Sequence, residues 1–159
     1  AIREINAGVY VFDAAHLRAA LATLGTDNDQ GEVYLTDVVA HAHRAGRSTS
    51  ALVVTDHWLV EGCNDRAQLA DLGAELNRRI LRDWMAQGVG VVDPSSTWVD
   101  VTAELAQDVT LEQGVLVRGT TRIGQGARVG AYAILTDAVI PAGCVVAPFS
   151  QLDAGGAQG

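Results

Sequence analysis

Three polar side chains stand out as possible ligands for a sugar, a phosphate or a metal ion. The first, Asn6, lies in the stretch 4–12, where both faces of a predicted strand are otherwise largely apolar. A buried amide needs partners for two donors and one carbonyl oxygen, and the hydroxyl groups of a sugar can supply them. A hydrogen bond to adjacent backbone explains Asn6 more simply, and for this residue on its own we favour that interpretation.

The segment 61–65, Glu-Gly-Cys-Asn-Asp, places two acids and an amide between a predicted strand and a helix start. Ligands often bind at such strand ends in α/β folds. The oxygen of Asn64 suits a hard cation such as Mg²⁺, but one amide and loosely placed carboxylates do not complete an octahedral site. By itself, this segment therefore favours a helix cap. The segment 32–37 is similarly ambiguous, because Thr36 or Asp37 as a helix N-cap is a simpler explanation than a ligand loop.

The four histidines do not form an evident site. His41 and His43 are two residues apart on a predicted helix. This spacing points them to opposite sides, so they cannot chelate one metal ion together. We expect both to be exposed. His16 falls in a first helical turn and His57 in a loop, and neither has an evident partner in the sequence.

The charge of the chain argues against nucleic acid as a partner. The formal net charge is −8, there is no lysine, and all eleven basic residues are arginines. A phosphate would have to be held by guanidinium or backbone N–H groups. Four arginines lie largely off the apolar stripe of the longest predicted helix, where we favour a solvated face over a phosphate site: Arg66, Arg78, Arg79 and Arg82.

The remaining composition indicates a cytoplasmic protein without a membrane span. Cys63 and Cys144 lie far apart and are typical of reduced thiols, not of a disulfide framework. No apolar run reaches the length of a membrane-spanning helix.

Strand and helix patterns alternate in the first part of the chain. We predict strands at 4–12, 51–55 and 58–60, and helices after Asp13 and after Thr36, which together indicate an α/β unit. The longest helical pattern then runs from Asp65 to about Gln87 and ends at Gly88. Its apolar stripe consists of Leu69, Leu72, Leu76, Ile80 and Trp84.

The stretch from Val109 to Leu152 has a six-residue period. Large aliphatic residues recur every sixth position, with one five-residue step: Leu111, Val117, Ile123, Val129, Leu135, Ile140, Val146 and Leu152. Smaller or β-branched residues stand four positions after these aliphatic residues: Val115, Thr121, Ala127, Ala133, Val139, Cys144 and Ser150. This pattern predicts a parallel β-helix with three hexapeptides per triangular coil, with a glycine-rich β-meander as the alternative. Glycines at 114, 119, 124, 126, 130 and 143 are expected at or beside the corners.

Four motifs precede these repeats in order: Glu4-Ile-Asn-Ala-Gly-Val-Tyr, Gln30-Gly-Glu-Val-Tyr-Leu-Thr-Asp37, Val60-Glu-Gly-Cys-Asn-Asp-Arg-Ala-Gln-Leu69, and Gly88-Val-Gly-Val-Val-Asp-Pro94 with Trp98-Val-Asp100. The series resembles the family of bacterial bifunctional N-acetylglucosamine-1-phosphate uridyltransferases/glucosamine-1-phosphate acetyltransferases over essentially the whole chain. The resemblance implies α/β plus β architecture. We expect part of a Rossmann-like uridyltransferase domain at 1–64, a linker helix and connector at 65–107, and the start of a left-handed β-helix at 108–159.

The resemblance also implies two reactions. Acetyl passes from acetyl-CoA to glucosamine 1-phosphate, and uridyl then passes from UTP to N-acetylglucosamine 1-phosphate with Mg²⁺, releasing pyrophosphate and UDP-N-acetylglucosamine for cell-envelope synthesis. The family is cytoplasmic and trimerises through the β-helix. By motif, Asn6 matches the Asn that contacts the amino sugar, Thr36 the Thr near the sugar, and Asn64 the Mg²⁺ ligand. Cys63 and Asp65 depart from the Val and Asn that are common in the family.

The resemblance implies a fragment that is inactive alone. The family's nucleotide loop, with its Lys and its metal-binding Asp, would lie upstream of Ala1, and the acetyl-transfer residues downstream of Gly159. Two alternatives remain open. The segment could be a non-catalytic, trimerising β-helix module, or it could belong to a nucleotidyltransferase for another hexose 1-phosphate.

Overall fold

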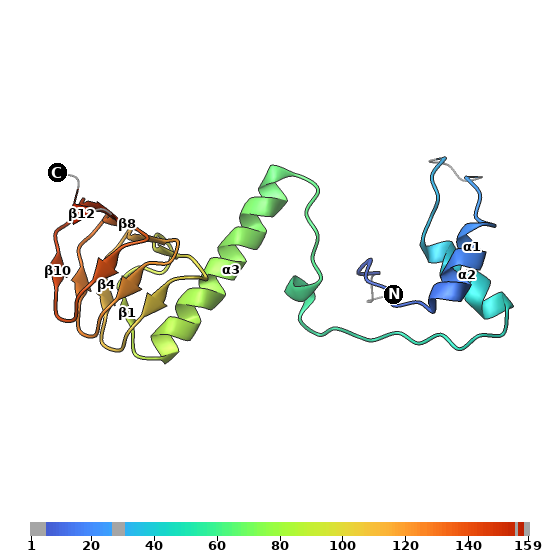
Figure 1. The fold of residues 1–159 in the computed structure, drawn as a ribbon, viewed down its shortest axis with the longest axis horizontal. Helices are drawn as coiled ribbons and strands as arrows, with labels where there is room; N and C mark the ends of the chain where they lie inside the picture. Colours follow the sequence, from blue (N-terminus) through green and yellow to red (C-terminus); the bar gives the residue numbers. More distant parts are fainter. Residues whose placement is uncertain (1–5, 27–30, 155, 158–159) are drawn as a thin grey trace. The chain divides into compact units, whose positions relative to one another are not determined.

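The computed structural model describes residues 6–26, 31–154 and 156–157 (Figure 1). The chain divides into two compact units, Ala1–Gly62 and Cys63–Gly159. Glu4 and Ile5 of the predicted first strand, and Gln30 of the second motif, lie outside the described part. The predicted division at 64/65 and 107/108 stays a prediction.

In the first unit, two short helices pack against each other: α1 (Ala14–Leu21) and α2 (Thr36–Arg44). Asp13 caps α1 as predicted, and its Oδ1 accepts a hydrogen bond from the backbone N–H of His16 at 2.8 Å. The same carboxylate lies 3.5 Å from the guanidinium of Arg47, which follows α2. Ala20 and Val38 are fully buried.

The strands predicted in the first unit do not form within its described residues. Residues 6–12 and 51–55 have no regular structure, and a 3₁₀ turn, η1 (His57–Leu59), stands where the strand at 58–60 was predicted. The side chains of Val11 and Leu52 are 98% and 90% exposed. A strand needs a neighbour that pairs its N–H and C=O groups, and no partner strand occurs in the described part of this unit. The sequence pattern therefore marks apolar segments that have no sheet to join.

The second unit begins with α3 (Arg66–Ala86), whose bounds agree with the predicted helix. At its start, Oδ1 of Asp65 accepts from the Gln68 N–H at 2.8 Å, and Oε1 of Gln68 accepts from the Asn64 N–H at 2.8 Å. This reciprocal pair resembles a capping box. At its end, Gly88 adopts a φ of 96°, and the Val89 N–H donates to the Trp84 carbonyl.

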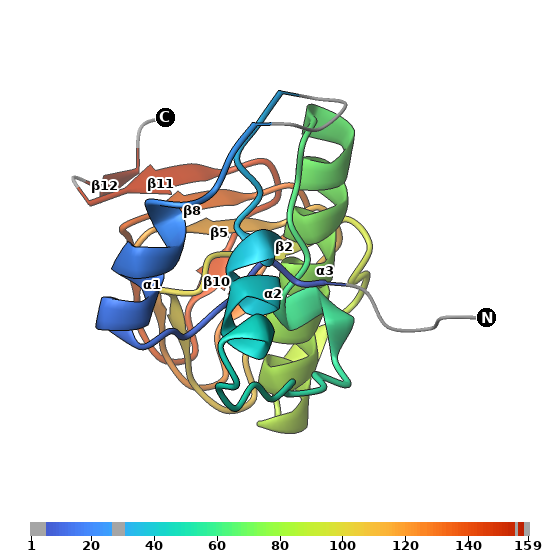
Figure 2. The same ribbon diagram turned by 90° about the vertical axis from the view of Figure 1, so that its right-hand side faces the viewer.

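The strands that follow α3 form the parallel β-helix predicted from the repeats, which is left-handed as the family resemblance implies. They are β1 (Gly90–Val91), β2 (Trp98–Val99), β3 (Glu104–Leu105), β4 (Thr110–Leu111), β5 (Leu116–Arg118), β6 (Arg122–Ile123), β7 (Arg128–Val129), β8 (Ile134–Thr136), β9 (Val139–Ile140), β10 (Val145–Val146), β11 (Gln151–Asp153) and β12 (Gly156–Ala157). They make three sheets, in the orders β1-β4-β7-β10, β3-β6-β9 and β2-β5-β8-β11, with β12 antiparallel to β11. Figure 2 shows β2, β5, β8 and β11 stacked one above another.

The register of the sheets explains the six-residue period and its one exception. Thr110 pairs with Arg128, one coil of eighteen residues later, whereas Arg128 pairs with Val145 after seventeen. The missing residue falls between β8 and β9, where the five-residue step occurs in the sequence. The aliphatic residues at the repeat positions point inward and stack, and they are buried from Leu111 at 0% to Val146 at 5% exposure, with Leu152 half-buried.

The stack includes a coil that precedes the hexapeptide repeats. Strands β1, β2 and β3 pair in parallel with β4, β5 and β6. Val99, Ala103 and Leu105 are buried inside this first coil. The segment predicted as a connector therefore contributes strands to the β-helix.

The corner glycines have the two roles that the sequence predicts. Gly114 has a φ of 69°. A Cβ at Gly130 would lie 2.6 Å from the backbone nitrogen of Pro148 in the next coil. The first position needs a left-handed backbone, and the second needs the absence of a side chain.

The helix α3 contacts the first coil through only the second half of its predicted apolar stripe, where Ile80 and Trp84 pack against the core. Its most buried residues are Asn77 and Leu81, at 7% and 1% exposure, while Leu69 and Leu76 of the stripe are 58% and 55% exposed. The reason is that α3 contacts β1 and β2 (Figure 1), which cover the second half of the helix. Within this unit, the first half of the stripe has no equivalent cover.

The carboxamide of Asn77 pairs with the open edge of β2. Its Nδ2 donates to the Thr97 carbonyl at 2.8 Å, and its Oδ1 accepts from the Val99 N–H at 3.1 Å. The opposite edge of β2 is bonded to β5, where the Trp98 N–H donates to the Val115 carbonyl at 2.9 Å. One side-chain amide thus replaces the strand that β2 lacks on this side.

We predict that Asn77→Leu lowers the free energy of unfolding of the second unit by roughly 2–4 kcal/mol, because the Thr97 carbonyl and Val99 N–H lose their partners in a buried site. Urea unfolding of the whole chain measures this change. The matched control is Arg82→Ala on the exposed face of the same helix, for which we expect a change within about 0.5 kcal/mol. Equal stability of Asn77→Leu and the unaltered chain would contradict the role of the amide.

Candidate functional site

Asn6 is exposed in the structure, and its Oδ1 accepts a hydrogen bond from the Gly8 N–H at 3.0 Å. This bond confirms the simpler interpretation, in which adjacent backbone pairs with the amide, for the side-chain oxygen of Asn6. The premise that Asn6 is buried is wrong, because the strand predicted around it has not formed. The role of Asn6 in sugar binding stays a prediction.

Thr36 is the exposed first residue of α2, but it does not cap the helix. The N-cap position is Leu35, which makes no side-chain cap. The helix instead starts with tight backbone bonds, from the Asp37 N–H to Tyr34 and from the Val38 N–H to Leu35, both at 3.1 Å. The N-cap interpretation of Thr36 or Asp37 is therefore wrong, and capping does not explain the Thr36 hydroxyl.

Asn64 directly precedes Asp65, the N-cap of α3, and is exposed. The cap is Asp65, as the simpler interpretation of this segment predicts, and Asn64 takes part through its backbone N–H only. Capping therefore leaves the amide oxygen of Asn64 available as a ligand.

These residues supply only part of a Mg²⁺ site. Asn64 offers one neutral oxygen, and Oδ1 of the neighbouring Asp65 already accepts from Gln68. Among the described residues, no three His, Cys, Asp or Glu side chains gather in a metal-binding arrangement. Mg²⁺ commonly keeps several waters and takes further oxygens from substrate phosphates, so one amide ligand is compatible with such a site.

The three predicted site residues are divided between the two units. Asn6 and Thr36 belong to the first unit and Asn64 to the second. Within the first unit, no hydrogen bond joins Asn6 to Thr36 where the chain is described.

Two histidines lie closer together than the sequence suggests. His16 on α1 is 7% exposed, His41 on α2 is half-buried, and their ring centroids are 5.1 Å apart. The predicted exposure of His41 is therefore wrong, whereas His43 is exposed as predicted. The spacing of His41 with the buried Val38 and Ala42 on one face of α2 is a signal that would have placed it inward.

The arginines in the middle of α3 pair with one acid of the same helix. Nε of Arg78 lies 2.7 Å from Oε2 of Glu75, and Nε of Arg79 lies 2.6 Å from Oε1 of Glu75. Hydrogen bonds from Arg78 and then Arg79 lower the pKa of Glu75 from 4.5 to about 2. These contacts favour a structural role for the pair over a phosphate site.

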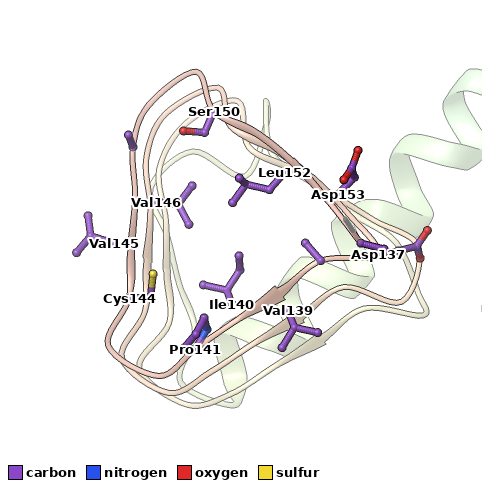
Figure 3. A pocket seen from close by; sticks show the side chains of 13 residues that line it. Asp137, Val139, Ile140, Pro141, Cys144, Val145, Val146, Ser150, Leu152 and Asp153 are labelled. Atoms are coloured by element: carbon purple, nitrogen blue, oxygen red, sulfur yellow. The ribbon is translucent and has the colours of Figure 1, made fainter. Parts of the chain in front are cut away.

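A hollow lies at the last coil of the described chain. Figure 3 shows Ile140, Val146 and Leu152 pointing into the triangle of the coil, while Val145 points away from it. The centre of this hollow is apolar, and its polar residues, such as Ser150 and Asp137, lie at the corners. The centre of the hollow therefore suits the packing of apolar side chains.

The chain was compared with known proteins. No family model matches it. A relative from Kineococcus radiotolerans, named bifunctional protein GlmU, is 53% identical over 146 residues, covering 92% of this chain and 30% of the relative. This chain belongs to the GlmU family. GlmU relatives from Micrococcus luteus and Cutibacterium acnes are 49% and 45% identical, each over 98% of this chain and over 34% and 42% of their own length.

The family assignment confirms the resemblance found from the motifs and repeats. The chain spans about a third of the length of the GlmU relatives it matches, from 30% to 42% in these three cases. In the described part of the chain, none of the helices is both long and apolar enough to cross a membrane.

We predict that the stabilisation from Glu75 disappears in acid. The folded pKa of about 2 lies below the ordinary 4.5, so the contribution is complete above pH 4.5 and is lost as the pH falls toward 2. Urea unfolding of Glu75→Gln and the unaltered chain should therefore differ at neutral pH and converge in acid. Asp83→Asn, at an exposed acid of the same helix, is the matched control. A difference that stays constant with pH would contradict this account.

Proposed function

We propose that this chain is part of a bifunctional GlmU enzyme that makes UDP-N-acetylglucosamine. Its first reaction transfers acetyl from acetyl-CoA to glucosamine 1-phosphate. In the second reaction, a phosphate oxygen of N-acetylglucosamine 1-phosphate attacks the α-phosphorus of UTP, and pyrophosphate leaves. The observation that carries the proposal is the 53% identity to a protein named bifunctional GlmU across 92% of this chain.

Within this proposal, three residues of the chain contribute to uridyl transfer. The Asn6 amide and the Thr36 hydroxyl bind and orient the amino sugar. The Asn64 amide oxygen would hold Mg²⁺ beside the nucleotide-sugar phosphates. When bound, the ion would supply neutralisation of the charge on the phosphate oxygens. The availability of the Thr36 and Asn64 side chains, which the helix starts do not use, supports these roles.

The chain on its own is proposed to catalyse neither reaction. The three residues proposed above bind the sugar and supply one ligand to Mg²⁺. Phosphoryl transfer needs charge stabilisation around the whole triphosphate. For acetyl transfer, the chain is proposed to supply only the first coils of the β-helix. An enzyme for another hexose 1-phosphate remains the alternative within the nucleotidyltransferases, and a panel of sugar phosphates on the complete protein distinguishes the two.

We predict that Asn64→Ala in the complete protein lowers uridyl transfer about tenfold or more, equivalent to ~1.4 kcal/mol of barrier, and leaves acetyl transfer unchanged. Separate assays of pyrophosphate release and of free CoA release measure the two reactions. Cys63→Val is the matched control, because it alters the neighbouring exposed side chain without touching the proposed ligand. Equal loss of both activities, or no loss, would contradict the role of Asn64.

The β-helix is proposed to assemble this chain into a homotrimer. One outward row of side chains is apolar over three coils, at Trp98, Leu116 and Ile134, and continues to Gln151 in the fourth. An equivalent outward row on another sheet contains an ion pair, since Nε of Arg122 lies 3.1 Å from Oε2 of Glu104. An apolar row beside charged rows is typical of a surface that another chain covers. A trimerising module without catalysis is the second candidate function that this row favours.

We predict that Ile134→Glu converts a trimer of the chain into a monomer, because it places a charge in the apolar row. Light scattering after size-exclusion chromatography measures the mass. Val139→Glu is the matched control, since Val139 is an exposed outward residue of a different sheet. A monomeric unaltered chain, or a trimer that tolerates Ile134→Glu, would contradict this surface.

A further inference from the structure

Two buried nitrogen atoms lie in one contact between α1 and α2 and have no hydrogen-bond partner: Nε2 of His16 and Nδ1 of His41. His16 is 7% exposed, so its ring is almost fully removed from water. Buried polar atoms in folded proteins are nearly always paired, and an unpaired atom calls for an explanation such as a bound ion. Here the two unpaired atoms belong to rings that touch each other.

The separation of the two rings fits a shared metal ion. The ring centroids are 5.1 Å apart and the planes are inclined by 47°. Two imidazoles on one tetrahedral zinc ion, with Zn–N distances of about 2.0–2.1 Å, also place their ring centroids roughly 5 Å apart. No hydrogen bond joins the two nitrogens, so both lone pairs are available to a metal ion.

We propose that His16 and His41 form a two-imidazole binding site for a divalent transition cation, with Zn²⁺ as the representative ion. Imidazole nitrogen is a preferred ligand of Zn²⁺, and it is a poor ligand for Mg²⁺. The site uses none of the residues assigned to sugar or Mg²⁺ binding and goes beyond the proposed function.

The surroundings of the pair limit the ligand set to the two rings and water. The nearest acid in sequence, Asp13, already accepts from the His16 backbone N–H and lies 3.5 Å from Arg47. No third His, Cys, Asp or Glu completes a metal cluster in the described part of the chain. The ion is therefore exchangeable, and it links the first turn of α1 to the last turn of α2.

The test is titration of the untagged whole chain with Co²⁺, followed by its visible absorption, and with Zn²⁺ by calorimetry. All proteins carry Cys63→Ser, because an exposed thiol is itself a ligand for both ions. We expect one ion per chain, and we expect His16→Phe and His41→Leu each to weaken binding about tenfold or more. His43→Ala, at an exposed residue of the same helix, is the matched control and should bind as the parent does.

Each replacement puts an apolar side chain of similar bulk in place of an imidazole and removes one unpaired buried atom. The metal-free variants should therefore fold. Helix content by circular dichroism checks this. Binding that survives His16→Phe and His41→Leu, or that is lost equally in His43→Ala, would overturn the site. So would a parent that binds neither ion, because the two histidines would then serve packing only.

Discussion

The fold of the second unit depends on how the free strand edge of the first β-helix coil is paired. Each strand of a stacked coil hydrogen-bonds to the coil before it and to the coil after it, and the first coil has no predecessor. In this chain the Asn77 amide takes that place for β2, with one donor and one acceptor at 2.8 and 3.1 Å. A buried, unpaired carbonyl and N–H at this edge would oppose folding of the coil. The helix α3 is therefore the cap of the β-helix as well as the link that leads into it.

Beyond this cap, each coil supports the next through its interior and its corners. Inside, the aliphatic residues stack in register, from Leu111 to Val129 in one sheet and from Val117 to Leu135 in another. At one corner, the Gly119 N–H donates to Asp100 and the Thr120 N–H donates to Asp137, each at 2.8 Å. Hydrogen bonds from Thr120 hold the pKa of Asp137 below its usual range. The corners thus satisfy backbone groups that the short strands cannot pair.

The sequence predicts the parts of this fold that repeat or that depend on local signals. The six-residue period, its five-residue step and the glycine corners describe the β-helix correctly, because the period records which side chains point inward. The Asp65 cap and Gly88 locate α3 for similar local reasons. Asn77 could not be recognised, because a single polar residue in a helix resembles a solvated one until its partner strand is known.

The candidate site was less predictable. The strands predicted at 4–12 and 51–55 depend on distant partners, so an apolar pattern alone does not form them in the described residues, and Asn6 is exposed as a result. Thr36 and Asn64 owe their assignment to motif resemblance, which local structure neither requires nor opposes. The contact between His16 and His41 arises from the packing of two helices, which spacing along one helix does not reveal.

The central claim is that Asn77 completes the first coil and makes it as stable as the coils above it. Native-state hydrogen exchange of the whole chain tests this most directly at the Val99 N–H, whose acceptor is Asn77. We predict that this amide exchanges only through global unfolding of the second unit. Its exchange rate should then equal that of the Val117 amide in the next coil. Exchange of Val99 as fast as that of the exposed residues 51–53 would contradict the account.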